Sequence, residues 1–198
     1  MKGIEKLTSV RLAEVLSQKG AVPSEAITNA LYAQDRHGEP FVQVLVDGGH
    51  ITEWDLAKLV TENFQLPFLM ASNYQIADTS KARLPKLLLF EHMLVPLDVF
   101  DNVVVVVMPI MISFEVMAKI QKEHNCDLFP YVGLLSENKK VLTELFKDYP
   151  AWLEHEQKRR EVQAVKKGSK DKSGNWMSIF DAGDQAIQDT LVKKPTKK

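Results

Sequence analysis

The segment RLAEVLSQKGAVPSEAITNALYAQ, residues 11–34, is followed after five residues by PFVQVLVDGGHITEWDLAKLVTEN, residues 40–63. Both segments are 24 residues long, and apolar residues and a glycine recur in the second at an offset of 29 positions. The aligned pairs are Leu12 with Phe41, Leu16 with Leu45, Gly20 with Gly49, Val22 with Ile51, Ile27 with Leu56, and Leu31 with Val60. This fixed offset indicates an internal repeat, so we expect the two copies to fold alike.

Each copy has the pattern of two short helices joined by a turn. In the first copy, apolar residues at helical spacing over residues 9–19 stop at Gly20, and a second helix starts near Ser24. In the second copy, a Gly-Gly pair ends the first helix and Thr52 is a favourable N-cap for the next. Because one helix pair buries little apolar area, residues 1–68 are predicted to form a four-helix tandem repeat unit.

The second half of the chain contains β-branched runs that predict a small sheet. Residues 93–100 and 103–108 are separated by an Asp-Asn pair, which is a strong signal for an antiparallel hairpin. A third strand is predicted at residues 126–132. Pro130 within this strand favours a position at the sheet edge or in a bulge, because proline cannot donate a ladder hydrogen bond.

Helices are predicted between and after the last two of these strands. Ser113 is a favourable N-cap for a helix that runs to His124, and Ser136 for a helix after the third strand. The order β-β-α-β-α describes a small α+β sandwich over residues 81–153, with a linker at residues 69–80. The predicted fold class is therefore α+β.

The C-terminal part of the chain has a different composition. Residues 154–174 are predicted to be the solvated end of a helix that continues as a charged linker, and residues 175–198 to be a flexible amphipathic tail. This tail is either a peptide that docks on a partner or a strap that folds back on its own domain, and the pattern leaves both open. The candidate docking residues are Trp176, Ile179, Phe180, Ile187 and Leu191.

The composition argues against several classes of protein. A net charge of −1 gives no overall field that would attract nucleic acid. The single cysteine, Cys126, excludes an intramolecular disulfide framework. The longest apolar run, residues 103–108, is too short to cross a bilayer, and the N-terminus has no apolar core of signal-peptide length. We therefore expect a cytoplasmic protein with no membrane insertion and no nucleic-acid partner.

No constellation of catalytic residues is present in the sequence. None of the nine glycines is followed by lysine, so the chain has no phosphate-binding loop of the nucleotide-hydrolase type. The five histidines lack metal-ligand spacing, and Cys126 lies in a predicted strand without an obvious cationic neighbour to activate its thiol. The sequence therefore indicates a protein that is not an enzyme and that needs no metal or cofactor.

The duplicated pattern resembles the MshEN-type domain at the N-terminus of type II secretion and type IV pilus assembly ATPases, the GspE and PilB class. The family motif of Arg-Leu, aliphatic residues, a central glycine and a terminal glutamine is matched in the first copy by Arg11, Leu12, Leu16, Gly20, Leu31 and Gln34. Residues 64–147 resemble the continuation of that N-terminal region, and the ATPase motor is missing from this sequence. The resemblance implies a bacterial adaptor that docks on a protein of a secretion, pilus or signalling system.

The resemblance also implies an alternative function as a cyclic di-GMP sensor. Arg11 would donate two hydrogen bonds to guanine, and Gln34 offers both a donor and an acceptor. The helix N-termini near Ser24 and Thr52 are candidates to accept phosphate. The candidate ligand-binding residues are Arg11, Leu12, Leu16, Leu31, Gln34, Phe41 and Leu45.

The second copy departs from the family motif at its polar positions. Pro40 stands where this copy would carry arginine, and Asn63 where it would carry glutamine. Ala13 and Val42 replace the motif glycine in the first and second copies. Arg11 also has a structural alternative, an ion pair with a neighbouring glutamate on the surface. The sequence therefore leaves two interpretations of the degenerate motif open: a scaffold for docking, or a ligand site formed by the first copy alone.

Overall fold

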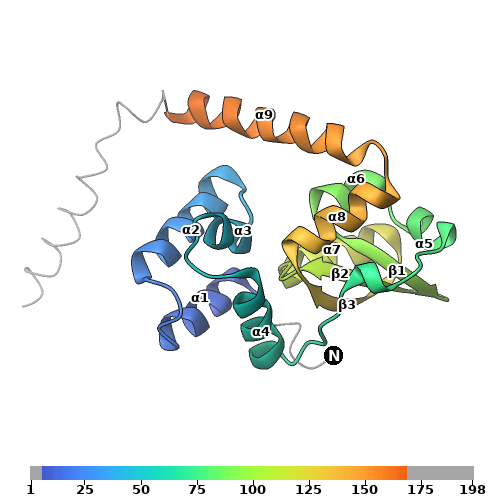
Figure 1. Ribbon diagram of the computed structural model, residues 1–198, viewed down its shortest axis with the longest axis horizontal. Helices are drawn as coiled ribbons and strands as arrows, with labels where there is room; N and C mark the ends of the chain where they lie inside the picture. The colour runs from blue at the N-terminus through green and yellow to red at the C-terminus, as the bar shows by residue number, and fades with distance from the viewer. Residues whose placement is uncertain (1–5, 169–198) are drawn as a thin grey trace, which may run out of the picture. The chain divides into compact units, whose positions relative to one another are not determined.

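The computed structural model describes the backbone of residues 6–168 and the side chains of residues 6–159. Within these bounds the protein is α+β, with helical elements before and after a three-stranded sheet (Figure 1). The chain forms one compact unit as far as Gln157. The predicted tail at residues 175–198, with Trp176 and the other candidate docking residues, lies outside the described residues.

The predicted repeat folds as two helix pairs. The bounds are α1 (Ser9–Gln18), α2 (Ser24–His37), α3 (Phe41–Asp47) and α4 (Glu53–Phe64). The Oγ1 atom of Thr52 accepts the backbone N–H of Asp55 at 3.1 Å, which confirms this residue as the N-cap of α4. Thr8 caps α1 in the same way, through the N–H of Arg11 at 3.2 Å.

Each helix pair turns at a glycine in the left-handed region. Gly20 has φ +60° after α1, and Gly49 has φ +68° after α3. In both turns a residue with a side chain would be strained by its backbone conformation, although a Cβ atom would meet nothing within 4 Å. The glycine that recurs in the two copies therefore serves the backbone of the turn.

The second half begins with a 3-10 turn at Ala71–Asn73 and two short helices before the sheet. One of them, α5, begins at Asp78, inside the segment predicted as a linker. The bounds are α5 (Asp78–Arg83), α6 (Lys86–Glu91), β1 (Val95–Phe100), β2 (Val103–Pro109), α7 (Phe114–His124), β3 (Asp127–Gly133), α8 (Leu135–Leu145) and α9 (Tyr149–Gly168).

The sheet has the strand order β1-β2-β3. β1 and β2 form the predicted antiparallel hairpin, with an irregularity in register between Pro96 and Asp98. β3 runs parallel to β2, and α7 makes the crossover that a parallel pair requires. Pro130 therefore lies in an edge strand, as predicted, and part of that edge is covered because Phe68 bridges to Val132.

One continuous apolar core includes residues of both the helical half and the α+β half. Asn138 of α8 is fully buried among them, and its amide nitrogen donates to the carbonyl oxygens of Met93 at 2.9 Å and Val107 at 3.0 Å. These two bonds hold α8 against the beginning of β1 and the middle of β2. Because the two carbonyls precede or lie within strands, Asn138 fixes the position of the helix on the sheet.

The prediction that Ser136 caps α8 was wrong. The N-cap residue is Leu134, which makes no side-chain cap. Instead, a carboxylate oxygen of Glu53 accepts both the N–H and the hydroxyl of Ser136, each at 3.0 Å. A carboxylate at a helix N-terminus is electrostatically favourable, so α4 supplies to α8 the cap that the local sequence lacks.

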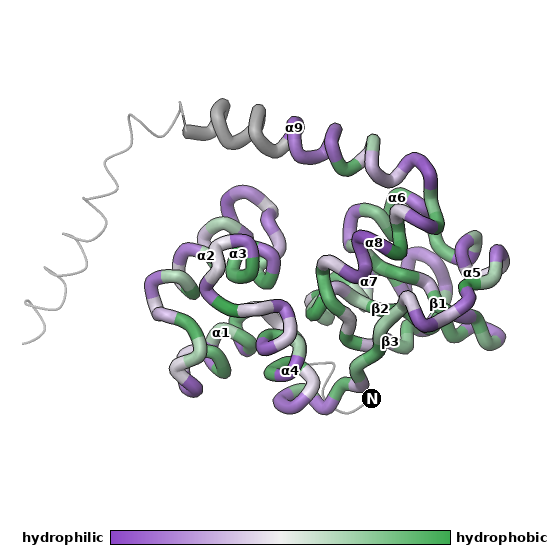
Figure 2. Tube along the Cα trace, viewed as in Figure 1, coloured by the Kyte–Doolittle hydropathy of each residue, from purple (hydrophilic) through white to green (hydrophobic). Residues whose placement is uncertain are grey.

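The first turn of α9 is attached to the core by aromatic side chains. Tyr149 is fully buried, and its ring lies 4.9 Å from that of Phe90, centroid to centroid. Burial raises the pKa of Tyr149 to about 12, because the phenolate would be poorly solvated there. Figure 2 shows that the described part of α9 beyond this anchor is mostly hydrophilic.

Candidate functional site

Most of the apolar candidates for ligand contact belong to the core. Leu12, Leu16 and Leu45 have no exposed surface, and Phe41 is 1% exposed. Leu31 is half-buried and packs against the same core. In this conformation these side chains hold the helix pairs together, so they offer a guanine ring little or no surface.

Arg11, the proposed guanine reader, lies on the surface of α1. Its guanidinium donates to the carboxylate of Glu14 at 2.5 Å, one helical turn away. Both side chains are about half exposed, at 53% and 49%, and exposed ion pairs of this kind contribute little to stability. The structure therefore shows Arg11 in a surface ion pair with a neighbouring glutamate, which is the alternative to guanine binding that the sequence left open.

Gln34, the second polar candidate, faces another part of the molecule. Its Oε1 atom accepts the hydroxyl of Ser9 at 2.6 Å, and this bond joins α2 to the start of α1. Ser9 and Arg11 are two residues apart on one helix, which places their side chains about 200° apart around its axis. The structure therefore does not bring Arg11 and Gln34 together at one site.

The N-terminus of α4 is a poor candidate for phosphate. The hydroxyl of Thr52 donates to the carboxylate of Asp55 at 2.6 Å, and Glu53 occupies the same first turn. Two carboxylates there already use the favourable end of the helix dipole and would repel a further anion. The α2 N-terminus near Ser24 has no side-chain cap, with Glu25 in its first turn.

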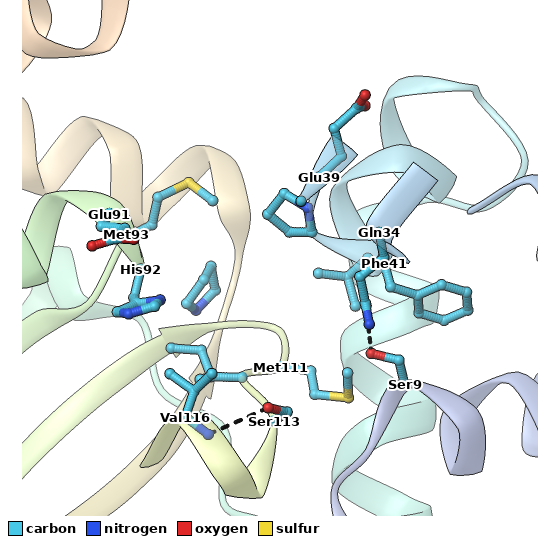
Figure 3. Close-up of a pocket in the computed structure, with 15 residues that line it drawn as sticks. Ser9, Gln34, Glu39, Phe41, Glu91, His92, Met93, Met111, Ser113 and Val116 are labelled. Carbon is cyan, nitrogen blue, oxygen red and sulfur yellow. Dashed lines mark hydrogen bonds between the residues drawn. The ribbon is translucent and has the colours of Figure 1, made fainter. Parts of the chain in front are cut away.

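A pocket of about 270 Å³ lies where α1, α2 and α3 meet the turn after α6 and the segment after β2 (Figure 3). Two of the predicted residues, Gln34 and Phe41, line it. The other lining residues labelled in Figure 3 were missed by sequence reasoning; they are Ser9, Glu39, Glu91, His92, Met93, Met111, Ser113 and Val116. They come from positions as far apart as 9 and 116, so local periodicity carried no signal for them.

Trp54 of the second copy and Phe68, which follows that copy in the sequence, form an exposed aromatic pair. Trp54 in the first turn of α4 is 58% exposed, and its ring lies 5.5 Å from that of Phe68, which is 37% exposed. Phe68 is the residue that bridges to β3. Large exposed aromatic side chains are enriched at the energetic centres of protein interfaces, which makes this pair a candidate docking surface.

The described residues contain no group of three or more histidine, cysteine and acidic side chains that could hold a metal ion. Burial lowers the pKa of His92 and raises that of Cys126, since both charged forms would be poorly solvated. A thiol with a raised pKa is a poor nucleophile near neutral pH. Over the part of the chain that the structure covers, no helix is both long and apolar enough to cross a membrane.

Comparison of the structure with known proteins shows the fold. It is similar to the N-terminal domain of XpsE, with a TM-score of 0.54 and 19% sequence identity, over 68% of this chain and 92% of that one. It is also similar to the structure of MshE with cyclic di-GMP, with a TM-score of 0.52 and 14% identity, over 68% of this chain and 98% of that one. No protein-family model and no curated protein matches the chain. The GspE/MshEN-like N-terminal fold that the resemblance implied is therefore confirmed.

Proposed function

We propose that this protein is a non-enzymatic docking module that binds a protein of a secretion, pilus or signalling system. The observation that carries the proposal is the extent of the structural similarity. Two thirds of this chain accounts for nearly the whole of the XpsE N-terminal domain and of the compared MshE chain. A chain built on such a domain, with no group of side chains that could hold a metal ion among its described residues, is better suited to binding than to chemistry.

Two parts of the chain are candidates for the contact with the partner. The first is the exposed pair of Trp54 and Phe68, which presents flat apolar surface beside the edge strand β3. The second is the amphipathic segment at residues 175–198, which follows a charged linker in the sequence. Truncation of an aromatic anchor that a partner buries typically costs more than about 1 kcal/mol, which is a loss of affinity of about fivefold or more.

The test is quantitative affinity capture with four purified proteins: the full chain, a variant without residues 170–198, Trp54→Ala, and the matched control Tyr74→Ala. Tyr74 is 54% exposed and has no aromatic partner among the described residues. The proposal expects one partner protein to be retained by the full chain and the control, and lost from at least one of the other two. Retention of the same proteins at equal levels by all four would remove both candidate surfaces.

The alternative function is a cyclic di-GMP sensor. It is favoured by the structural similarity to MshE with cyclic di-GMP and by the presence of Arg11 and Gln34 in the first copy. It requires Arg11 to leave Glu14, and either a ligand contact with a single copy or an opening of the buried leucine face. A rise in Tm with cyclic di-GMP but not with GMP, absent in Arg11→Ala, would favour the sensor.

A further inference from the structure

The pocket of about 270 Å³ that includes Gln34 is separate from the surface around Arg11 and from the exposed pair of Trp54 and Phe68. Arg11 does not line it, and neither does Trp54 or Phe68. Its volume is close to the lower limit of about 300 Å³ that is usual for ligand pockets. A single ring system therefore fits this volume, whereas a molecule with two bases, two sugars and two phosphates does not.

The walls of the pocket are mostly apolar and partly adaptable. Met93 contributes from the turn before β1, Met111 from the segment after β2, and Val116 from α7, whereas the ring of Phe41 on α3 points away from these three (Figure 3). Methionine side chains are flexible and polarizable, and they make favourable contacts with aromatic rings. These walls suit a flat, apolar molecule.

Some polar groups in the lining have hydrogen-bond donors that are not used within the described part of the chain. Ser9 and Gln34 use one donor and one acceptor on each other, which leaves the amide nitrogen of Gln34 without an acceptor within the described part of the chain. The hydroxyl oxygen of Ser113 accepts the N–H of Val116 at 3.4 Å, so its own proton is available to a ligand. His92 is half-buried, and its lowered pKa keeps the imidazole neutral near neutral pH.

The charges at the pocket select against anions. Two carboxylates are among the lining residues, the half-buried Glu39 and the exposed Glu91, and no lysine or arginine lines the pocket, although Lys119 is near enough to help lower the pKa of His92. A carboxylate or phosphate group on a ligand would meet like charge there, whereas an ammonium group would meet opposite charge. The pocket therefore favours a neutral or cationic molecule.

The backbone beside the pocket is strained on both sides. Ile110, which stands between the lining residues Pro109 and Met111, has φ +61°, and Met93 has φ +48°. A β-branched residue in the left-handed region is an outlier, and such strain concentrates at ligand clamps and switch regions. The surrounding contacts hold it in place here, including the bond from the N–H of Ile110 to the carbonyl of Gly133 at 2.9 Å.

We propose that this pocket binds a small aromatic amine: one flat apolar ring system with a hydrogen-bonding edge and a positive charge. The ring would lie among Met93, Met111 and Val116, and the amino group would lie toward Glu39 or Glu91. This ligand site is additional to the docking function and shares no residue with the proposed docking surface. Because its lining comes from both the repeat helices and the α+β half, the ligand stabilises the packing of one on the other.

The test uses three probes with the same ring and different charge: tryptamine (cation), indole (neutral) and indole-3-acetate (anion). Each is titrated into the full chain labelled at its methionine methyl groups, and binding is followed by NMR. We expect saturable shifts at Met93 and Met111 with millimolar or tighter affinity, in the order tryptamine, indole, indole-3-acetate. Met70, which does not line the pocket, is the internal control.

A double variant, Glu39→Gln with Glu91→Gln, tests how much the two negative charges contribute to binding, apart from the shape of the pocket. Glu91 is exposed and Glu39 is half-buried, and glutamine keeps the size of both side chains, so the variant retains the fold. We expect it to weaken tryptamine binding about two- to fivefold, which is the effect of losing exposed ion pairs, and to leave indole binding unchanged. The proposal is overturned if no probe gives saturable shifts at Met93 and Met111, or if indole-3-acetate binds as tightly as tryptamine.

Discussion

The two copies of the repeat share their buried side chains and differ in their polar ones. Leu12 and Phe41 are equally buried, as are Leu16 and Leu45, and the turn glycines have φ values within ten degrees of each other. The first motif glycine position also holds a buried apolar residue in both copies, Ala13 and Val42. The apolar repeat thus specifies one helix-pair geometry twice, and the fold needs nothing else in common.

The polar positions show what the second copy has lost. Gln34 reaches across to Ser9 of another helix, whereas the equivalent Asn63 donates to the carbonyl of Leu59 in its own helix at 2.7 Å. Arg11 is a surface residue of α1, whereas the equivalent Pro40 is the N-cap residue of α3. Of these two aligned pairs of polar positions, therefore, only Gln34 of the first copy bonds to another helix, and Gln34 also lines the pocket.

The largest expected effect tests whether the apolar positions are equivalent. Leu16→Ala and Leu45→Ala each remove a fully buried side chain, so each should lower the free energy of unfolding by about 2–5 kcal/mol. Denaturant unfolding measures this loss. Val10→Ala, at a 63% exposed position, is the control and should change stability by less than about 0.5 kcal/mol. A small loss at only one of the two leucines would show that the copies are not equivalent.

A smaller effect is expected at the turn glycines. Gly20→Ala and Gly49→Ala place a side chain at φ +60° and φ +68°, with open space around the new Cβ atom. The loss should therefore be conformational only, about 1–2 kcal/mol in each copy. Asparagine tolerates this region better, so Gly20→Asn and Gly49→Asn should lose less when measured by the same unfolding curves. Equal losses for alanine and asparagine would contradict the conformational explanation.

The polar difference predicts unequal effects at equivalent positions. Gln34→Ala breaks a part-buried bond between helices and should cost about 0.5–1.5 kcal/mol, whereas Asn63→Ala breaks an exposed bond within one helix and should cost less. A double-mutant cycle of Ser9→Ala and Gln34→Ala should show that the two residues are coupled. Additive losses in this cycle would mean that the bond contributes nothing.

The smallest expected effect is a pH dependence at the pocket that the first copy helps to form. Burial lowers the pKa of His92 from its ordinary 6.5; Glu91 opposes this shift and Lys119 adds to it. As the pH falls below about 6.5, the unfolded chain takes up this proton first, so stability is lost on acidification and not on alkalinisation. The Tm of the wild type should therefore fall more than that of His92→Gln between about pH 7.5 and about pH 5.5. Parallel Tm curves would contradict a lowered pKa.

The sequence predicted the features that depend on neighbouring residues. The four helices of the repeat, the cap at Thr52 and the hairpin between β1 and β2 all follow from periodicity, capping preference and β-branched runs. The edge position of Pro130 follows from its missing donor. Each of these signals lies within a few residues of the feature that it predicts.

The features that the sequence did not reveal depend on residues far apart in the chain. Ser9 and Gln34 are 25 positions apart, and Glu53 and Ser136 are 83 apart. No periodicity relates such pairs, so the pocket and the true cap of α8 became visible only in three dimensions. For the apolar ligand candidates the sequence left burial in the core and contact with a ligand both open, because helical spacing indicates which residues share a face but does not show how completely another helix covers it.

The measurement that tests the account most directly is isothermal titration calorimetry of cyclic di-GMP into the full chain and into Arg11→Ala. If the repeat is a scaffold whose leucines are committed to the core and whose arginine pairs with Glu14, neither protein should release or absorb heat beyond dilution, even at high micromolar ligand. Saturable heat in the wild type that Arg11→Ala abolishes would contradict this account and identify the first copy as a ligand site.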